Sequence, residues 1–320
     1  MKKIVSLLMV VLVLATLACS AAFAEEWPTK AITLICGYSA GGSSDLGCRY
    51  LATALEKILG VPVIVENQPG SSSWLAWNTL LNTAKPDGYT FALVNHGVMF
   101  GHYDATNPRE QTMDDFELLC NHVVDYQCLC IRLDETRYSD YASMIEYAKT
   151  NPLIIASASN TINSGDATVA KMLEQRHGCQ FVVIPVDGAS DATTMFLAGE
   201  TDVLSCNVGD VGEAEENGYK PIVVFGQERS KYLPDVPTST ELGLDTYVSA
   251  SVRGYAYMPG VDPEIVAKMQ DALVKAFDDE EYQASMAAMG AETKLYVGED
   301  YTNLLLGMLD ERLELWGVEK

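Results

Sequence analysis

Residues 32–45 read ITLICGYSAGGSSD, an apolar run followed by a glycine-rich segment and then by a helical pattern. The apolar part, residues 32–36, is typical of a strand, and the glycines after it allow a tight turn into a helix. Such a turn leaves backbone N–H groups unpaired at the start of the helix, where the helix dipole adds partial positive charge. The segment therefore predicts a site for an anion that needs no lysine or arginine.

Short apolar runs alternate with helical patterns along almost the whole chain, which is typical of parallel α/β architecture. Strands are expected at residues 32–36, 61–66, 90–94, 127–132, 153–156, 181–184, 202–205, 222–225 and 253–258. Helices are expected between them. One begins at Asp262-Pro263, an N-cap and first-turn pair, and continues with an apolar stripe that predicts a core helix.

The N-terminus has the layout of a secretory signal peptide. Two lysines precede an apolar stretch, residues 4–18, and Ala22-Phe23-Ala24 closes the segment as a cleavage site. We therefore predict export to the periplasm and cleavage after Ala24, with a lipid anchor at Cys19 as the alternative. The apolar stretch is shorter than the roughly 20 residues of a spanning helix, so a soluble mature protein is expected.

Composition limits the partners. The net charge is −23 at pH 7, and it becomes −25 when the two lysines of the signal peptide are removed. This acidity argues against binding to nucleic acid or anionic lipid. With 320 residues, of which 48% are hydrophobic, the chain can bury the cores of two domains. We expect a monomer.

Seven cysteines remain in the mature chain, and an odd number scattered in this way is not a disulfide framework. They are Cys36, Cys48, Cys120, Cys128, Cys130, Cys179 and Cys206. Cys120 and His122, with Cys128 and Cys130, offer donors for zinc. However, the paired C-x-x-C spacing is missing, and cysteines alternating on an apolar strand behave as small hydrophobes. We predict no metal site and no cofactor.

Motifs along nearly the whole mature chain resemble those of the extracytoplasmic solute receptors of tripartite tricarboxylate transporters, the TctC or Bug family. In the first loop, AGG at 40–42, Asp45 and Arg49 match the family pattern, while GYS at 37–39 stands where Phe-Pro is usual. Further matching blocks are ENQPG at 66–70, PDGYT at 86–90 and PDVPT at 234–238.

The resemblance implies an α/β fold of two domains, the type II periplasmic-binding-protein architecture, with a ligand cleft between the domains. It places domain 1 at residues 25–124 and 250–320 and domain 2 at residues 125–249, after the signal peptide at 1–24. It also implies a receptor, not an enzyme, that captures a small carboxylate and delivers it to integral-membrane transporter subunits. A soluble sensor of the same fold that signals to a partner is the alternative.

A second loop, residues 157–165, has the character of the first. It follows an expected strand, consists mostly of small hydroxyl and amide residues, and precedes a helix. We predict that a carboxylate is held between the two loops, with help from the end of the strand at 90–94. The predicted ligand-binding residues are Tyr38, Ser39, Ala40, Gly41, Gly42, Asp45, Asn95, His96, Ser159, Asn160, Ser164, Gly165, Asp187 and Gly188.

Asp187 stands where the family commonly has a basic residue. It would repel a second carboxylate of the ligand if the two came close. We therefore hypothesise a monocarboxylate, or a carboxylate that also carries an amine which Asp45 or Asp187 pairs.

Residues 37–41 also spell Gly-x-Ser-x-Gly, the nucleophile elbow of α/β-hydrolases. A hydrolase that uses Ser39 is the weaker alternative, because the elbow follows the first strand of the mature chain and leaves no earlier strands to build an oxyanion hole. The histidines, none of which occupies the late loop that a triad needs, are His96, His102, His122 and His177.

Overall fold

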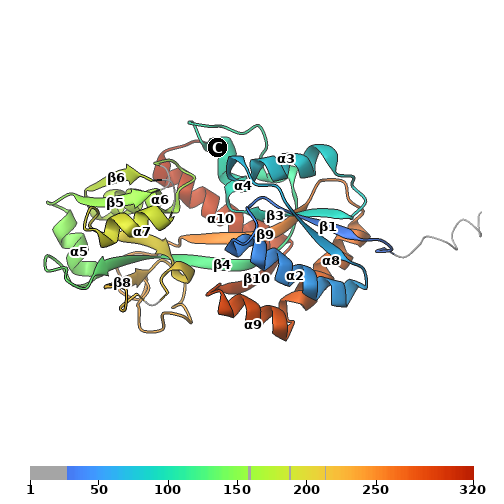
Figure 1. Ribbon diagram of the computed structural model, residues 1–320. Coiled ribbons are helices and arrows are strands. Elements are labelled where there is room, and N and C mark those ends of the chain that lie inside the picture. The colour runs from blue at the N-terminus through green and yellow to red at the C-terminus, as the bar shows by residue number, and fades with distance from the viewer. Residues whose placement is uncertain (1–26, 158–159, 187–188, 213) are drawn as a thin grey trace, which may run out of the picture.

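The computed structural model describes residues 27–157, 160–186, 189–212 and 214–320. The predicted signal peptide, residues 1–24, lies outside this part of the chain. The described residues form two α/β lobes along the long axis of the molecule (Figure 1). In these residues the structure contains no helix with the length and apolar character needed to cross a membrane.

The first lobe is built on six strands of the main sheet. They are β1 (Ile32–Cys36), β2 (Val63–Asn67), β3 (Thr90–Asn95), β4 (Glu117–Arg132), β9 (Ala250–Tyr257) and β10 (Thr293–Val297). The strand order is β10-β4-β9-β3-β1-β2. Strand β1 pairs in parallel with β2 and β3, whereas β9 runs antiparallel to β3 and β4. The sheet is therefore mixed: the expected α/β architecture is confirmed, with antiparallel strands beside the parallel ones.

Strand β4 is shared by both lobes. Residues 117–126 pair with β9 in the first lobe, and residues 127–132 pair with two strands of the second lobe. These are β7 (Leu204–Asn207) and β8 (Tyr219–Val224), and a separate parallel pair consists of β5 (Leu153–Ser157) and β6 (Phe181–Pro185). A single strand thus connects the hydrogen-bonded frameworks of the two lobes.

The helices cover these sheets on their outer faces. They are α2 (Ser43–Leu59), α3 (Trp74–Thr83), α4 (Gly97–Phe100), α5 (Tyr141–Ala148), α6 (Gly165–His177), α7 (Ala189–Leu197), α8 (Pro263–Phe277), α9 (Glu280–Ala288) and α10 (Glu299–Trp316). The predicted start of α8 is confirmed, because Asp262 caps it by accepting the N–H of Glu264 at 2.9 Å.

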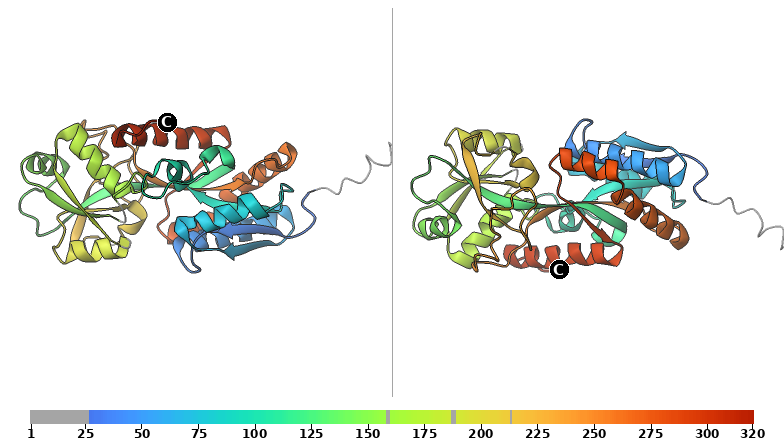
Figure 2. Two further views of the ribbon diagram at one scale, coloured as in Figure 1. Left: turned by 90° about the horizontal axis from the view of Figure 1, so that it is seen from above. Right: turned by 90° about the horizontal axis from the view of Figure 1, so that it is seen from below.

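Helix α10 packs against both lobes. It lies along the side of the molecule where the lobes meet (Figure 2). Gln175 of α6 donates to the carbonyl of Leu315 at 2.7 Å, and the indole N–H of Trp316 donates to Thr168 of α6 at 3.1 Å. The last turn of α10 is therefore hydrogen-bonded to the second lobe, although most of the helix covers the first lobe.

Each predicted strand has a counterpart, but β10 and the first ten residues of β4 were missed. Polar residues interrupt the apolar pattern of β4, yet their side chains are buried and paired. Asn121 donates to the carbonyl of Lys294 at 2.8 Å, and the ring of His122 bonds the hydroxyl of Tyr282 at 2.9 Å. Tertiary partners thus permit a strand that the local pattern does not indicate.

Candidate ligand-binding cleft

Three adjoining cavities share His96 and together form a cleft between the lobes. Their volumes are about 460, 200 and 480 Å³. The first cavity is lined by the loop after β1, by the end of β3 and by β9. The second and third are lined by residues of both lobes, including the start of α6. The structure therefore brings the two predicted loops to one cleft.

Asp45 holds the first loop in shape. Its carboxylate accepts the N–H of Gly41 at 2.8 Å, and it also binds Arg49 at 2.9 Å and the amide of Asn67 at 2.8 Å. Gly41 has φ +86°, a conformation that favours glycine. Burial opposes ionisation of Asp45, but the hydrogen bonds outweigh it and hold the pKa of this carboxyl below its usual range.

This arrangement does not support the predicted contact of Asp45 with the ligand or with an amine. The residue is 1% exposed, its oxygens are already bonded, and it lines none of the three cavities. Ala40 and Gly41 are likewise absent from the cavity walls, whereas Tyr38, Ser39 and Gly42 are present. Asp45 positions the loop instead.

The N-terminus of α2 opens toward the first cavity. Gly42 occupies the N-cap position, so no side chain there accepts the N–H groups of the first turn. Ser43 and Ser44 of that turn line the cavity with Ser251 and Arg253 of β9. No carboxylate among the described residues forms an ion pair with Arg253. An anion here would meet the helix dipole, hydroxyls and a guanidinium that forms no direct ion pair with a described carboxylate, although the charge of Arg253 acts on Asp125 and Asp210.

Arg253 was not predicted as a site residue. The available signal was a single basic residue in an otherwise apolar strand, at a position expected to cross between the domains. The residues around Arg253 have the pattern of a strand. No neighbouring residue in the sequence indicates that this strand borders the loop after β1.

Asn95 and His96 line the first cavity, as predicted. The amide nitrogen of Asn95 donates to the hydroxyl of Tyr38, and its Oδ1 accepts the N–H of Gly97 at 2.7 Å. These two bonds fix the orientation of the amide. They also hold the Tyr38 ring at the cavity wall.

His96 presents a neutral ring to the cleft. Its Nδ1 accepts the N–H of Val252 at 3.3 Å, so the proton of the neutral ring resides on Nε2, which is free to donate. Burial, followed by the charges of Arg312 and Arg253, lowers the pKa of His96 to about 3. The ring therefore remains an uncharged donor at neutral pH.

The second loop starts α6 with a capped N-terminus. The hydroxyl of Ser164 accepts the N–H of Ala167 at 3.2 Å and lies 2.6 Å from the hydroxyl of Ser157. Ser164 lines the third cavity and Gly165 the second. Asn160 lines none of the three. The predicted residues Ser159, Asp187 and Gly188 lie outside the described part of the chain.

Gly165 lets Gln127 of β4 approach the start of α6. A Cβ at this position would lie 2.6 Å from the amide atoms of Gln127. The same amide donates to Asp166 at 2.9 Å and accepts from the hydroxyl of Ser249. The close approach therefore holds the Asp166 carboxyl in the wall of the second cavity.

Two carboxyl groups of the second lobe, Asp166 and Asp210, line the second cavity. Burial raises the pKa of Asp166 to about 7, although hydrogen bonds from Ser205 and Gln127 oppose the shift. Burial also raises the pKa of Asp210. The cleft thus has Arg253 and the α2 N-terminus on one side and carboxyl groups on the other.

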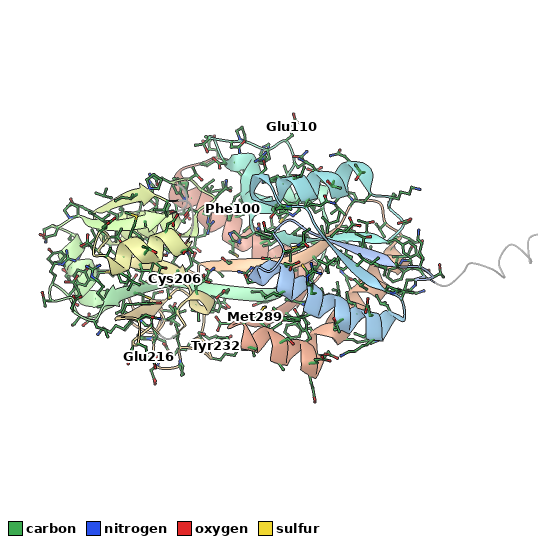
Figure 3. The ribbon with its side chains drawn as sticks, in the orientation of Figure 1. Phe100, Glu110, Cys206, Glu216, Tyr232 and Met289 are labelled. Carbon is green, nitrogen blue, oxygen red and sulfur yellow. The ribbon has the colours of Figure 1, made fainter. Side chains whose placement is uncertain are left out.

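Arg312 of α10 also lines the second cavity. It is 3% exposed, donates to the carbonyl of Ile162 at 3.2 Å and lies over the ring of Phe100 at 4.1 Å. Figure 3 shows Phe100 and Cys206, another residue of this cavity, near the junction of the lobes. Sequence analysis missed Arg312, Asp166 and Asp210, because each belongs to a helical or turn segment without a motif.

The hydrolase alternative gains no support from this geometry. Ser39 and His96 both line the first cavity. However, Nδ1 of His96 accepts the N–H of Val252 and Nε2 carries the ring proton, so neither nitrogen is available to accept the proton of Ser39. Within the described chain no hydrogen bond joins the Ser39 hydroxyl to a histidine. The other three histidine rings bond the Arg109 carbonyl, the Tyr282 hydroxyl and the Asp245 carboxylate.

The four residues considered as zinc donors from the sequence do not all lie together. Cys128 and Cys130 are close to Cys206 of β7, and all three sulfur atoms lie within 4.8 Å of one another. Cys120 and His122 are not part of this group.

Comparisons with known proteins agree with this fold. The family model described as "Tripartite tricarboxylate transporter family receptor" matches residues 48–312. The "UPF0065 protein in gbd 5'region" of Cupriavidus necator is 32% identical over 278 residues, covering 87% of this chain and 84% of the relative.

Two solved structures illustrate the similarity of fold. A TctC solute-binding protein from Polaromonas, without ligand, has a TM-score of 0.80 at 24% identity, over 91% of this chain and 99% of its own. Rpa4515 of R. palustris with adipate has a TM-score of 0.72 at 20% identity, over 92% of this chain and 99% of its own.

Proposed function

The chain belongs to the tripartite tricarboxylate transporter receptor family, and we propose that it captures a small carboxylate in the cleft and delivers it to integral-membrane transporter subunits. The observation that carries this proposal is the uncapped N-terminus of α2 in a cavity that Arg253 also lines, with no ion pair between Arg253 and any carboxylate of the described chain. Rpa4515, which shares the fold, was solved with the dicarboxylate adipate.

The carboxylate would be held mostly by neutral donors and one charge. First-turn N–H groups of α2, the Nε2–H of His96 and the guanidinium of Arg253 all border the first cavity. Hydrogen bonds to a charged group are each worth about 1.5–3 kcal/mol. This arrangement would bind and orient an anion, and in the described part of the site no hydrogen bond joins Ser39 to a histidine.

Closure of the cleft would complete the site. Residues of both lobes line the second and third cavities, so a ligand that touches both lobes favours the closed form. We propose that the lobes correspond to residues 25–124 with 250–320 and to residues 125–249. The chain would then pivot where β4 and β9 pass between them.

The function is tested by a thermal-shift screen of mono-, di- and aminocarboxylates on the mature protein. A ligand present at about 100 times its Kd adds roughly 2.7 kcal/mol of stability, and each kcal/mol raises Tm by about 2–4 °C in domains of this size. A panel without any stabilising carboxylate would contradict the proposal. Uptake of the ligand that is found, in cells with and without this protein, separates a transport receptor from a sensor.

Export is tested separately. We propose that the protein is periplasmic and that processing leaves Glu25 as the first residue. N-terminal sequencing of protein from the periplasmic fraction should begin at Glu25. A mature N-terminus at a lipid-modified Cys19 would instead favour the anchored form.

A further inference from the structure

Three buried thiols converge beside the cleft without a role in carboxylate binding. Cys128 and Cys130 lie on the same face of β4, two residues apart, and Cys206 lies directly opposite Cys128 on the antiparallel strand β7. Their exposed fractions are 0%, 0% and 8%. Strand pairing therefore holds three sulfur atoms at one point.

The spacing of the sulfurs suits a metal ion. The sulfurs of Cys128 and Cys206 are 3.7 Å apart, and all three lie within 4.8 Å of one another. A metal with bonds of about 2.3 Å to three sulfurs in a plane would separate them by about 4 Å. The sulfur–sulfur separations therefore need to change by less than about 1 Å. Among the described residues no other three His, Cys, Asp or Glu donors lie as close together.

The donor type limits the ion. Three thiolates without an oxygen donor select soft cations such as Zn²⁺ or Cu⁺ and disfavour Mg²⁺ or Ca²⁺. Zn²⁺ prefers a fourth ligand, and Cys206 borders the second cavity, from which a water molecule can supply it. A divalent ion with three thiolates leaves one negative charge, and the second cavity contains the cation Arg312 together with the carboxyls of Asp166 and Asp210.

We propose that Cys128, Cys130 and Cys206 form a binding site for a soft metal ion, with Zn²⁺ as its natural occupant and the second cavity as its entry path. Cys206 lies near the junction of the lobes (Figure 3) and borders the second cavity. None of the three cysteines lines the first cavity, where the carboxylate is proposed to bind. Either assignment can fail without the other.

The experiment is a titration of the reduced mature protein with Cd²⁺ under anaerobic conditions. A thiolate-to-cadmium charge-transfer band should grow and saturate at one ion per chain, and Zn²⁺ should displace it. Cys130→Ser and Cys206→Ser should each weaken cadmium binding at least tenfold. Cys179→Ser is the matched control, because Cys179 is also buried but lies in the other core of the second lobe and should leave the titration unchanged.

A second readout on the unaltered protein guards against variants that fail to fold. Bound Zn²⁺ should slow alkylation of Cys206, measured by mass spectrometry of its peptide, and should leave Cys179 unaffected. Absence of a cadmium band would overturn the proposal, as would the same band in Cys206→Ser. A disulfide between Cys128 and Cys206 in protein isolated without reductant would also overturn it, because both thiols would be consumed.

Discussion

Arg253 shows how one side chain can set the preference of the cleft for anions. It projects from a strand that contributes mainly backbone pairing, and it borders the cavity at the start of α2. Since it has no carboxylate partner among the described residues, its charge remains available to a ligand.

Arg253→Gln should weaken carboxylate binding by roughly ten- to a hundredfold, because a charged hydrogen bond worth about 1.5–3 kcal/mol is lost. Isothermal titration with the best carboxylate of the screen measures this. Arg229→Gln is the control, since Arg229 pairs with Glu241 on the surface at 2.8 Å and lines none of the three cavities. If both variants bind the carboxylate with equal affinity, Arg253 does not contribute to the site.

Gly165→Ala should destabilise the protein by about 1–3 kcal/mol, the usual effect of overpacking. The new Cβ would clash with the Gln127 amide at 2.6 Å and disturb its bonds to Asp166 and Ser249. Urea unfolding measures the change. Gly307→Ala in α10 is the matched control, because its Cβ would meet no atom within 4 Å. A Gly165 variant as stable as the control would show that Gln127 moves freely.

At the scale of elements, the start of α6 couples the second loop to β4. Asp166 belongs to the first turn of this helix and is surrounded by Gln127, Ser205, Cys206 and Asp210. An acid in this position is favoured by the helix dipole but disfavoured by burial, and burial is the larger effect on its pKa.

Asp166→Asn should therefore stabilise the protein at high pH and not at low pH. The pKa of Asp166 is about 7 in the fold, against about 3.9 for an unfolded chain. The folded state binds the proton more tightly, so the protein loses stability as pH rises from about 4 to 7. Because the side chain is partly exposed, we expect a gain on the order of 1–2 kcal/mol for the variant at pH 8.

The measurement is urea unfolding of both proteins at pH 4 and pH 8. Asp235→Asn serves as control, since Asp235 lies in an exposed loop and should change stability equally at both pH values. A gain for Asp166→Asn that is the same at pH 4 and pH 8 would show that the carboxyl is not strained by burial.

The elements differ in how far the sequence predicts them. Strands β1, β3, β5 and β6 begin where expected, since each is a short apolar run next to a turn signal. The long strand β4 was only partly recognised, because its polar residues are satisfied by partners more than a hundred residues away, such as Lys294 and Tyr282. No local pattern contains that information.

At the scale of the whole molecule, the two lobes bring opposite charges to one cleft. Arg253 and the start of α2 come from one side, and Asp166 and Asp210 come from the other. For the amine predicted to pair with Asp45 or Asp187, this pair of acids is a better candidate partner than the buried and already bonded Asp45.

We therefore expect an aminocarboxylate to bind better than a dicarboxylate of the same length. 5-Aminopentanoate and glutarate are a matched pair, because their chains have the same length and one end is an ammonium in the first and a carboxylate in the second. 5-Aminopentanoate should bind about tenfold more tightly than glutarate, a difference in binding free energy of about 1.4 kcal/mol. Titration of both ligands into the protein at pH 8, and again into Asp210→Asn, measures the preference and its origin. Tighter binding of glutarate would contradict this expectation while leaving the carboxylate receptor intact.

The strand, turn and helix at residues 32–59 and the repeated α/β alternation follow from local sequence alone, because turns, caps and apolar periodicity act over a few neighbouring residues. It also identified the residues at the end of β3 that enter the cleft. The internal bonding of Asp45 in its loop, the place of Arg253 at the first cavity and the meeting of three thiols beside the second cavity depend on the assembled fold. Those outcomes depend on which strands pair and which faces they turn inward, and strand pairing joins residues that are far apart in the chain.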